Sequence, residues 1–210
     1  SLLGFAAPSI IMMVFMSLYT IVDGIFISRF VGSNALSSLN IVYPMINVVI
    51  AIATMFATGG NAIVSRYLGQ GQEKQAREAL TEFVVICVLI STVFAALVIL
   101  FEDSICMFLG ANDELMADCK AYLTISMLFA PACTLQTLFQ SYFVTASRPG
   151  LGLWLTVAAG ILNAVLDYVL IVPIPLGIAG AALATGFGQL LPAVVGLIFF
   201  AIPRKTLRFC

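Results

Sequence analysis

Long apolar stretches dominate the chain, and six of them are each long enough to cross a bilayer as a helix. A hydrocarbon core of about 30 Å needs about 20 apolar residues in helical form. No water is available there, so each stretch must satisfy its own backbone, and the alternating pattern of membrane barrel strands is missing from the sequence. We therefore predict an all-α, polytopic membrane helix bundle with six transmembrane helices. The predicted spans are Leu2–Ser28, Ala35–Ser65, Ala79–Phe101, Leu115–Ala146, Leu151–Val172 and Ile178–Ile202.

The composition supports a protein whose main partner is the lipid bilayer. Hydrophobic residues make up 62% of the 210 residues and charged residues 9%, which argues against a soluble globular domain. The nine basic residues lie at the ends of apolar runs rather than on one face, so no nucleic-acid partner is expected. The sequence also shows no nucleophile–base pair, metal signature or phosphate-binding loop, and we expect no enzymatic activity.

Basic residues are distributed unevenly between the two ends of the predicted bundle. With six spans, both termini lie on one side, together with the loops after the second and fourth spans. That side holds seven basic residues: Arg66, Lys74, Arg77, Arg148, Arg204, Lys205 and Arg208. The other side holds only Arg29 and Lys120. By the positive-inside rule, we expect a multi-pass protein of the cytoplasmic membrane with both termini in the cytoplasm.

Two local patterns predict details of the backbone. Charged residues at helical spacing, such as Glu73 and Arg77, predict a short interfacial helix over Gln72–Glu82. Prolines inside the spans each remove a backbone hydrogen bond and are expected to bend their helices. These prolines are Pro8, Pro44, Pro131 and Pro192.

Two carboxylates lie inside predicted spans, where an ionisable group is costly unless it is paired, hydrated or neutralised. Asp23 on the first span and Asp167 on the fifth each lie about 9 Å from the outer end of their helix. The hydroxyl of Thr185 on the sixth span lies at a similar depth, about 10 Å below the same surface. Intramembrane carboxylates usually face a bundle interior and handle an ion. We therefore predict that three helices offer oxygen ligands to one cation.

Helical spacing gathers further polar residues on the faces that carry these ligands. On the fifth span a small and polar stripe consists of Thr156, Gly160, Asn163 and Asp167. The first span places Tyr19 one turn before Asp23. Similar lines on the second and sixth spans include Asn40, Asn47 and Gln189. Small and polar residues also serve close helix packing, and Gly177–Gly188 fits that interpretation, but packing gives no reason for two carboxylates at one depth.

Five segments, in this order and spacing, resemble one transporter family. They are SLYTIVDGIFISRFVG at 17–32, GGNAIVSRYLGQGQEKQA at 59–76, QSYFVTASRPGLGL at 140–153, GILNAVLDYVLI at 160–171 and GIAGAALATGFGQ at 177–189. Together they are similar to the amino-terminal half of multidrug and toxic compound extrusion (MATE) transporters. The resemblance extends over the whole chain. In the loop between the fourth and fifth spans, Ser147 stands where the family usually has glycine.

The resemblance implies a twelve-helix exporter made of two six-helix lobes around a central cleft. Inward movement of Na⁺ or H⁺ would drive export of small cationic, amphipathic compounds. Residues 1–202 would form the amino-terminal lobe, and residues 203–210 would begin a cytoplasmic linker to a second lobe outside this chain. That second lobe would belong to the same protein or, as the alternative, to a homodimer partner.

The resemblance also implies a set of site residues. The family's cation site in this lobe corresponds to Asp23, Asn163, Asp167, Thr185 and Tyr19. An amide on the fourth helix corresponds to Gln136 or Gln140, and Asn40, Asn47 and Gln189 are further candidates for contact with cation or substrate. Two carboxylates, an amide oxygen and a hydroxyl form an all-oxygen set that suits a hard cation such as Na⁺. Without histidine, any proton carrier must be a carboxylate. No other cofactor is expected.

Two other functions remain open at this point. A flippase for lipid-linked saccharides, from the same exporter superfamily, would share the architecture, but such proteins tend to line their cleft with arginine and lysine. No basic residue lies within the predicted spans except at their ends. A membrane scaffold that transports nothing would explain six helices but not the carboxylates.

Overall fold

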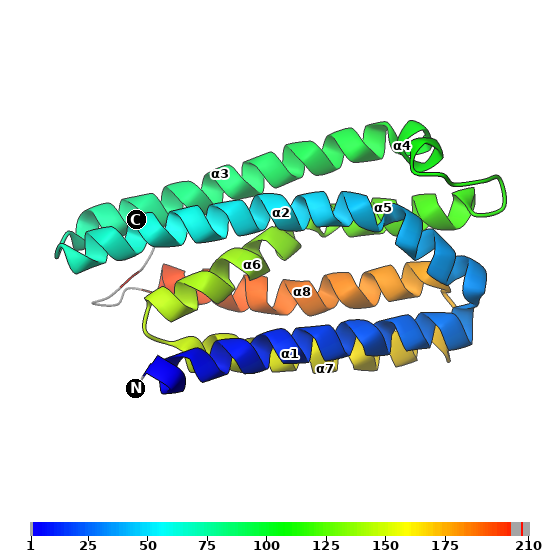
Figure 1. The fold of residues 1–210 in the computed structure, drawn as a ribbon. Coiled ribbons are helices and arrows are strands. Elements are labelled where there is room, and N and C mark those ends of the chain that lie inside the picture. Colours follow the sequence, from blue (N-terminus) through cyan, green and yellow to red (C-terminus); the bar gives the residue numbers. More distant parts are fainter. Residues whose placement is uncertain (1, 203–206, 208–210) are drawn as a thin grey trace.

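The computed structural model describes residues 2–202 and Leu207, and within this part of the chain the secondary structure is helical throughout, without strands (Figure 1). The helices are α1 (Leu2–Phe26), the π-helical η1 (Ile27–Val31), α2 (Ser33–Gly69), α3 (Glu73–Leu100), α4 (Glu102–Phe108), α5 (Met116–Leu128), α6 (Ala130–Thr145), α7 (Pro149–Ile171) and α8 (Ile178–Ala201). Among the described residues, five stretches are long and apolar enough to span a membrane, and the bent pair α5–α6 can form a sixth span. The predicted all-α bundle of six spans is confirmed.

Connections between the long helices gather at the two ends of the bundle (Figure 1). Helix α1 begins and α8 ends at the same end, where the α2–α3 and α6–α7 turns also lie. The α1–α2, α3–α5 and α7–α8 connections lie at the opposite end. This grouping agrees with the loop arrangement predicted from six spans. Apart from Leu207, the predicted linker at 203–210 lies outside the described residues.

One local prediction is wrong. Residues 73–82 do not form a separate interfacial helix but make up the first turns of α3, which runs without a break from Glu73. The predicted charge spacing is nevertheless present, because Arg77 Nη2 lies 3.1 Å from Glu73 Oε2. Only residues 70–72 form the turn between α2 and α3, so the charged residues that follow belong to α3 and not to a separate connecting segment.

The fourth span is broken at Phe129. Helices α5 and α6 meet there at an angle of 51°. Pro131 lies in the first turn of α6. The backbone N–H groups of a first turn have no partner within the helix, so proline costs no hydrogen bond at this position. Pro8, Pro44 and Pro192 lie inside continuous helices. Of these helices, α2 visibly bends in its first third (Figure 1).

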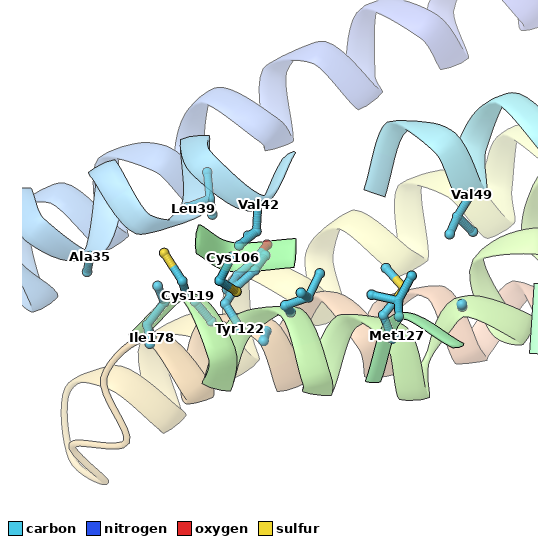
Figure 2. Packing of buried hydrophobic residues seen from close by; sticks show 14 of the residues in the cluster. Ala35, Leu39, Val42, Val49, Cys106, Cys119, Tyr122, Met127 and Ile178 are labelled. Carbon is cyan, nitrogen blue, oxygen red and sulfur yellow. The ribbon is translucent and has the colours of Figure 1, made fainter. Parts of the chain in front are cut away.

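The bundle has two clusters of buried hydrophobic side chains. The first lies toward the end of the bundle that carries α4, where α2, α4, α5 and α8 meet (Figure 2). Leu39 and Val42 from α2, Cys106 from α4 and Tyr122 from α5 belong to it. The second cluster is aromatic and lies toward the other end. In it the Phe200 ring of α8 stacks on the rings of Phe139 and Phe143, with centroids 5.5 and 5.6 Å apart.

Glycines on α8 allow this helix to approach its neighbours closely. A Cβ on Gly180 would lie 2.8 Å from the backbone oxygen of Leu170 on α7, and one on Gly188 would lie 3.1 Å from that of Ala159. Between these two positions on α8, the absent side chain of Gly186 leaves space that the Phe129 ring occupies. The packing interpretation of the Gly177–Gly188 segment is therefore confirmed, and α7 and α8 lie backbone against backbone.

We predict that Gly180→Ala destabilises the bundle by about 1–3 kcal/mol, because the new methyl group would collide with the α7 backbone rather than with a flexible side chain. Gly59→Ala on α2 is the matched control. A Cβ there meets nothing within 4 Å, so this variant should gain up to about 1 kcal/mol from helix propensity. Thermal unfolding of the purified variants in detergent measures both effects. Equal stability of the two variants would contradict the close approach of α7 and α8.

Candidate cation site

Helix α7 places the predicted polar stripe in the interior of the bundle. It packs against α1 on one side and α8 on the other. Thr156, Gly160, Asn163 and Asp167 are all buried, whereas the residues between them include exposed hydrophobic side chains. The absent side chain of Gly160 leaves room for the Phe15 ring of α1. The stripe is therefore the line along which α7 contacts both neighbours.

The carboxyl group of Asp167 is fully enclosed, with 0% of the residue exposed. Apart from the neighbouring carboxyl group, neither of its oxygens has a hydrogen-bond partner among the described residues, and the same holds for Oδ1 of Asp23. The two carboxyl groups lie close enough to interact directly. Two negative charges at this separation in an apolar enclosure require a cation or a proton to neutralise them. Three buried oxygens without partners are available to bind one.

An interhelical hydrogen bond places two further polar groups next to this pair. Asn163 Nδ2 donates to the Thr185 hydroxyl oxygen at 3.3 Å, which joins α7 to α8. The bond is possible because Gly188, one turn after Thr185, brings α8 against the Cβ of Asn163. Asn163 lies one turn before Asp167 on the same face of α7. The amide and the hydroxyl thus extend the oxygen-rich region from the carboxyl pair toward α8.

Two cavities adjoin the polar cluster and share Tyr19, Thr185 and Gln189 as lining residues. The smaller one, about 10 Å³, lies against Asn163 and has roughly the space of one water molecule. The larger one, about 140 Å³, extends past Asp23 toward α2 and α5. The cluster therefore has room for a small cation with part of its hydration shell.

The other predicted residues fall into two groups. Gln136 and Gln189 line the small cavity, so they lie beside Asn163 and Thr185. Gln140 does not line either cavity: its amide nitrogen donates to the Thr156 hydroxyl at 3.2 Å and lies 3.8 Å from the Met16 sulfur.

Asn40 and Asn47, the candidates for contact with cation or substrate on α2, are not part of the cluster around Asp167. Both are exposed on α2 and line neither cavity. The cavity-facing stripe of α2 instead includes Leu39, Tyr43 and Ile46. Each asparagine follows a cavity-facing residue by one position, which turns it by about 100° around the helix.

Several lining residues were not predicted from the sequence. Tyr43 on α2 and Tyr122 and Ser126 on α5 border the larger cavity with Asp23. Tyr43 directly precedes Pro44 and could have been noticed as a polar tip beside a helix bend. Tyr122 and Ser126 carry no such signal, because their place beside Asp23 depends on how α5 packs against α2 and α8.

Comparison with known proteins identifies the chain's relatives. A family model described as MatE matches residues 8–169. The multidrug export protein MepA of Staphylococcus haemolyticus is 23% identical over 209 residues, which cover 100% of this chain and 46% of that protein. The protein of the same name from Staphylococcus saprophyticus is 26% identical over 200 residues, covering 95% of this chain and 44% of the relative. The chain thus spans about half the length of these relatives.

Solved structures agree in fold. The outward-facing conformation of a multidrug resistance MATE family transporter of the MOP superfamily matches 98% of this chain and 46% of its own, with a TM-score of 0.91 and 20% identity. A MATE structure in a bent conformation matches 99% and 46%, with a TM-score of 0.90 and 20% identity. Since the MatE model covers more than half of the chain, the protein belongs to the MatE family of multidrug and toxic compound extrusion transporters.

Proposed function

We propose that this chain is the amino-terminal lobe of a cation-coupled antiporter that exports cationic, amphipathic compounds. The observation that carries the proposal is the pairing of the buried Asp167 with the half-buried Asp23, since three of their four carboxyl oxygens are buried without a hydrogen-bond donor and lie near the Asn163–Thr185 hydrogen bond. A static bundle gains nothing from three carboxyl oxygens that are buried without a donor, whereas an ion-coupled transporter needs a site that is complete only when occupied. The relatives named multidrug export protein support drug export, and the acidic, aromatic lining of the larger cavity supports cationic substrates.

In the proposed mechanism, binding of Na⁺ or H⁺ changes the relative stability of two arrangements of α1, α7 and α8. Asp23 and Asp167 neutralise the cation, while Asn163, Thr185 and Tyr19 supply neutral oxygens around it. An empty site leaves two carboxylates that repel each other, which favours separation of α1 from α7. An occupied site favours their contact. A ligand that prefers one arrangement shifts the population toward it and so couples the ion to the accessibility of the cleft.

Topology and domain organisation complete the proposal. Residues 1–202 form the lobe, residues 203–210 begin a linker, and a second lobe of similar length completes the cleft. The first and last helices of the lobe begin and end on the cytoplasmic side. That end of the bundle carries Arg66, Lys74 and Arg148 and is the more basic one. The alternative in which two copies of the chain form a symmetric dimer requires the same cleft-facing surface.

Charge in the cavities favours export of cations over the flippase alternative. The larger cavity contains the carboxyl group of Asp23 and three tyrosine side chains, Tyr19, Tyr43 and Tyr122. Neither of the two cavities is lined by lysine or arginine in the part of the chain that the structure describes. An acidic, aromatic enclosure attracts organic cations and disfavours the phosphate groups of lipid-linked saccharides.

Asp167→Asn is expected to abolish efflux of a cationic dye, because an amide cannot supply the negative charge that binds the coupling ion. Efflux is measured in cells that express the full-length transporter at matched levels. Asp113→Asn, an exposed carboxylate outside the spans, is the control and should retain wild-type efflux. Equal efflux by all three proteins would assign Asp167 a structural role, and no efflux by wild type would favour the flippase alternative.

Na⁺ is expected to stabilise the purified protein if it is the coupling ion. At a concentration about 100 times its dissociation constant, it should raise the free energy of unfolding by about 2.7 kcal/mol, measured as a shift in thermal unfolding. Asp167→Asn should lose this shift and Asp113→Asn should keep it. A wild-type protein that does not respond to Na⁺, but whose dye efflux follows a pH gradient, would identify H⁺ instead. An undiminished Na⁺ effect in Asp167→Asn would contradict the proposed site.

A further inference from the structure

A shallow groove of about 660 Å³ lies where the α6–α7 turn meets the last turns of α8. It has a polar end formed by Ser147 and Arg148, and its walls are apolar. The apolar lining includes Leu151 and Trp154 from α7 and Val195, Ile198 and Phe199 from α8. None of these residues belongs to the candidate cation site, which lies on the opposite face of α7.

A second groove continues the first along the same two helices. It measures about 500 Å³ and is lined only by hydrophobic side chains: Leu162, Leu166, Phe187, Leu190, Leu191 and Val194. Its positions follow those of the first groove at helical spacing, on α7 toward the carboxyl end and on α8 toward the amino end. From the start of α7 to Leu166 the helix rises about 25 Å. The two grooves adjoin at Val194 and Val195 of α8, and together they are called the α7–α8 groove, which extends from the bundle end to beyond mid-span.

The polar end of the α7–α8 groove carries a free positive charge. Arg148 is exposed and has no ion-pair partner among the described residues. It lies at the N-cap of α7, whose first backbone N–H groups and helix dipole add positive potential at the same place. The turn that holds it is tight, because Ser147 adopts a φ of 59° immediately before it. Charge and helix dipole therefore favour an anionic group here.

Trp154 indicates where the polar end of the groove lies relative to the membrane surface. It is a large side chain that lies exposed on the α7 surface beside the groove, less than two turns from Arg148. Tryptophan prefers the region of the lipid headgroups, where one edge of the ring meets lipid and the N–H meets polar atoms. The groove has a basic side chain and a tryptophan at one end and apolar walls along its length. A phospholipid, with one charged headgroup and long acyl chains, fits this arrangement.

We propose that the α7–α8 groove binds one anionic phospholipid, with its phosphate at Arg148 and the start of α7 and an acyl chain along the apolar continuation. The occupant is a lipid rather than free phosphate because the apolar part of the groove is as long as an acyl chain. This inference needs only that the bundle is embedded in a membrane. It does not depend on the ion coupling proposed above, so either proposal can fail alone.

The test uses Trp154, the one tryptophan among the 210 residues, as a reporter. The full-length transporter, with any tryptophan beyond these residues replaced by phenylalanine, is reconstituted in phosphatidylcholine vesicles. A minor fraction of brominated lipid, either phosphatidylglycerol or phosphatidylcholine, is included as a quencher. We expect Trp154 fluorescence to report about fivefold greater occupancy by the brominated phosphatidylglycerol, the preference that one basic side chain gives at a membrane surface.

Arg148→Gln should remove this preference while Trp154 remains quenched equally by both lipids. Arg66→Gln, an exposed basic residue at the same end of the bundle but on α2, is the matched control and should keep it. Three results would overturn the proposal. They are equal quenching by both lipids in the wild type, an unchanged preference in Arg148→Gln, and no quenching of Trp154 by either lipid, which would mean that protein such as a second lobe covers the groove.

Discussion

The carboxyl pair formed by the buried Asp167 and the half-buried Asp23 is the constraint to which the rest of the lobe is fitted. In a membrane, a charge on α1 and a charge on α7 can be tolerated only where protein shields both from lipid. The flanking helices meet that condition: α7 lies between α1 and α8, and its polar stripe is turned wholly inward. The lipid-facing surface of α7 can then remain apolar, as its exposed isoleucine and valine side chains show.

Small residues set the distance between α7 and α8. At Gly180 the backbone of α8 approaches α7 more closely than a side chain would allow, and at Gly188 the approach is tighter than most side chains would accept. That approach brings the Thr185 hydroxyl within reach of the Asn163 amide. Packing and polar chemistry are therefore not alternative explanations of the glycine-rich segment. The glycines set the distance between the helices, and the polar residues between them use it.

The sequence was sufficient to predict the six spans, the grouping of the loops and the inward stripe of α7, because each follows from helical period and from the thickness of a bilayer. The sequence could not predict the distance between α1 and α7 or the two cavities, since these depend on helix crossing angles and on the 51° break at Phe129. Asn40 and Asn47 show what helical spacing alone does not predict. Their spacing indicated a polar face on α2, but not which neighbour that face would meet.

The larger cavity has a consequence for the packing of the lobe. Its space of about 140 Å³ is partly open, so water or a small solute can enter it, and it differs from a sealed void in a core. Ala130 and Ala182 border the cavity with small side chains. Larger residues at these two positions would close the space beside Asp23, so the lobe keeps a route to this carboxyl group where closer packing of the helices would remove it.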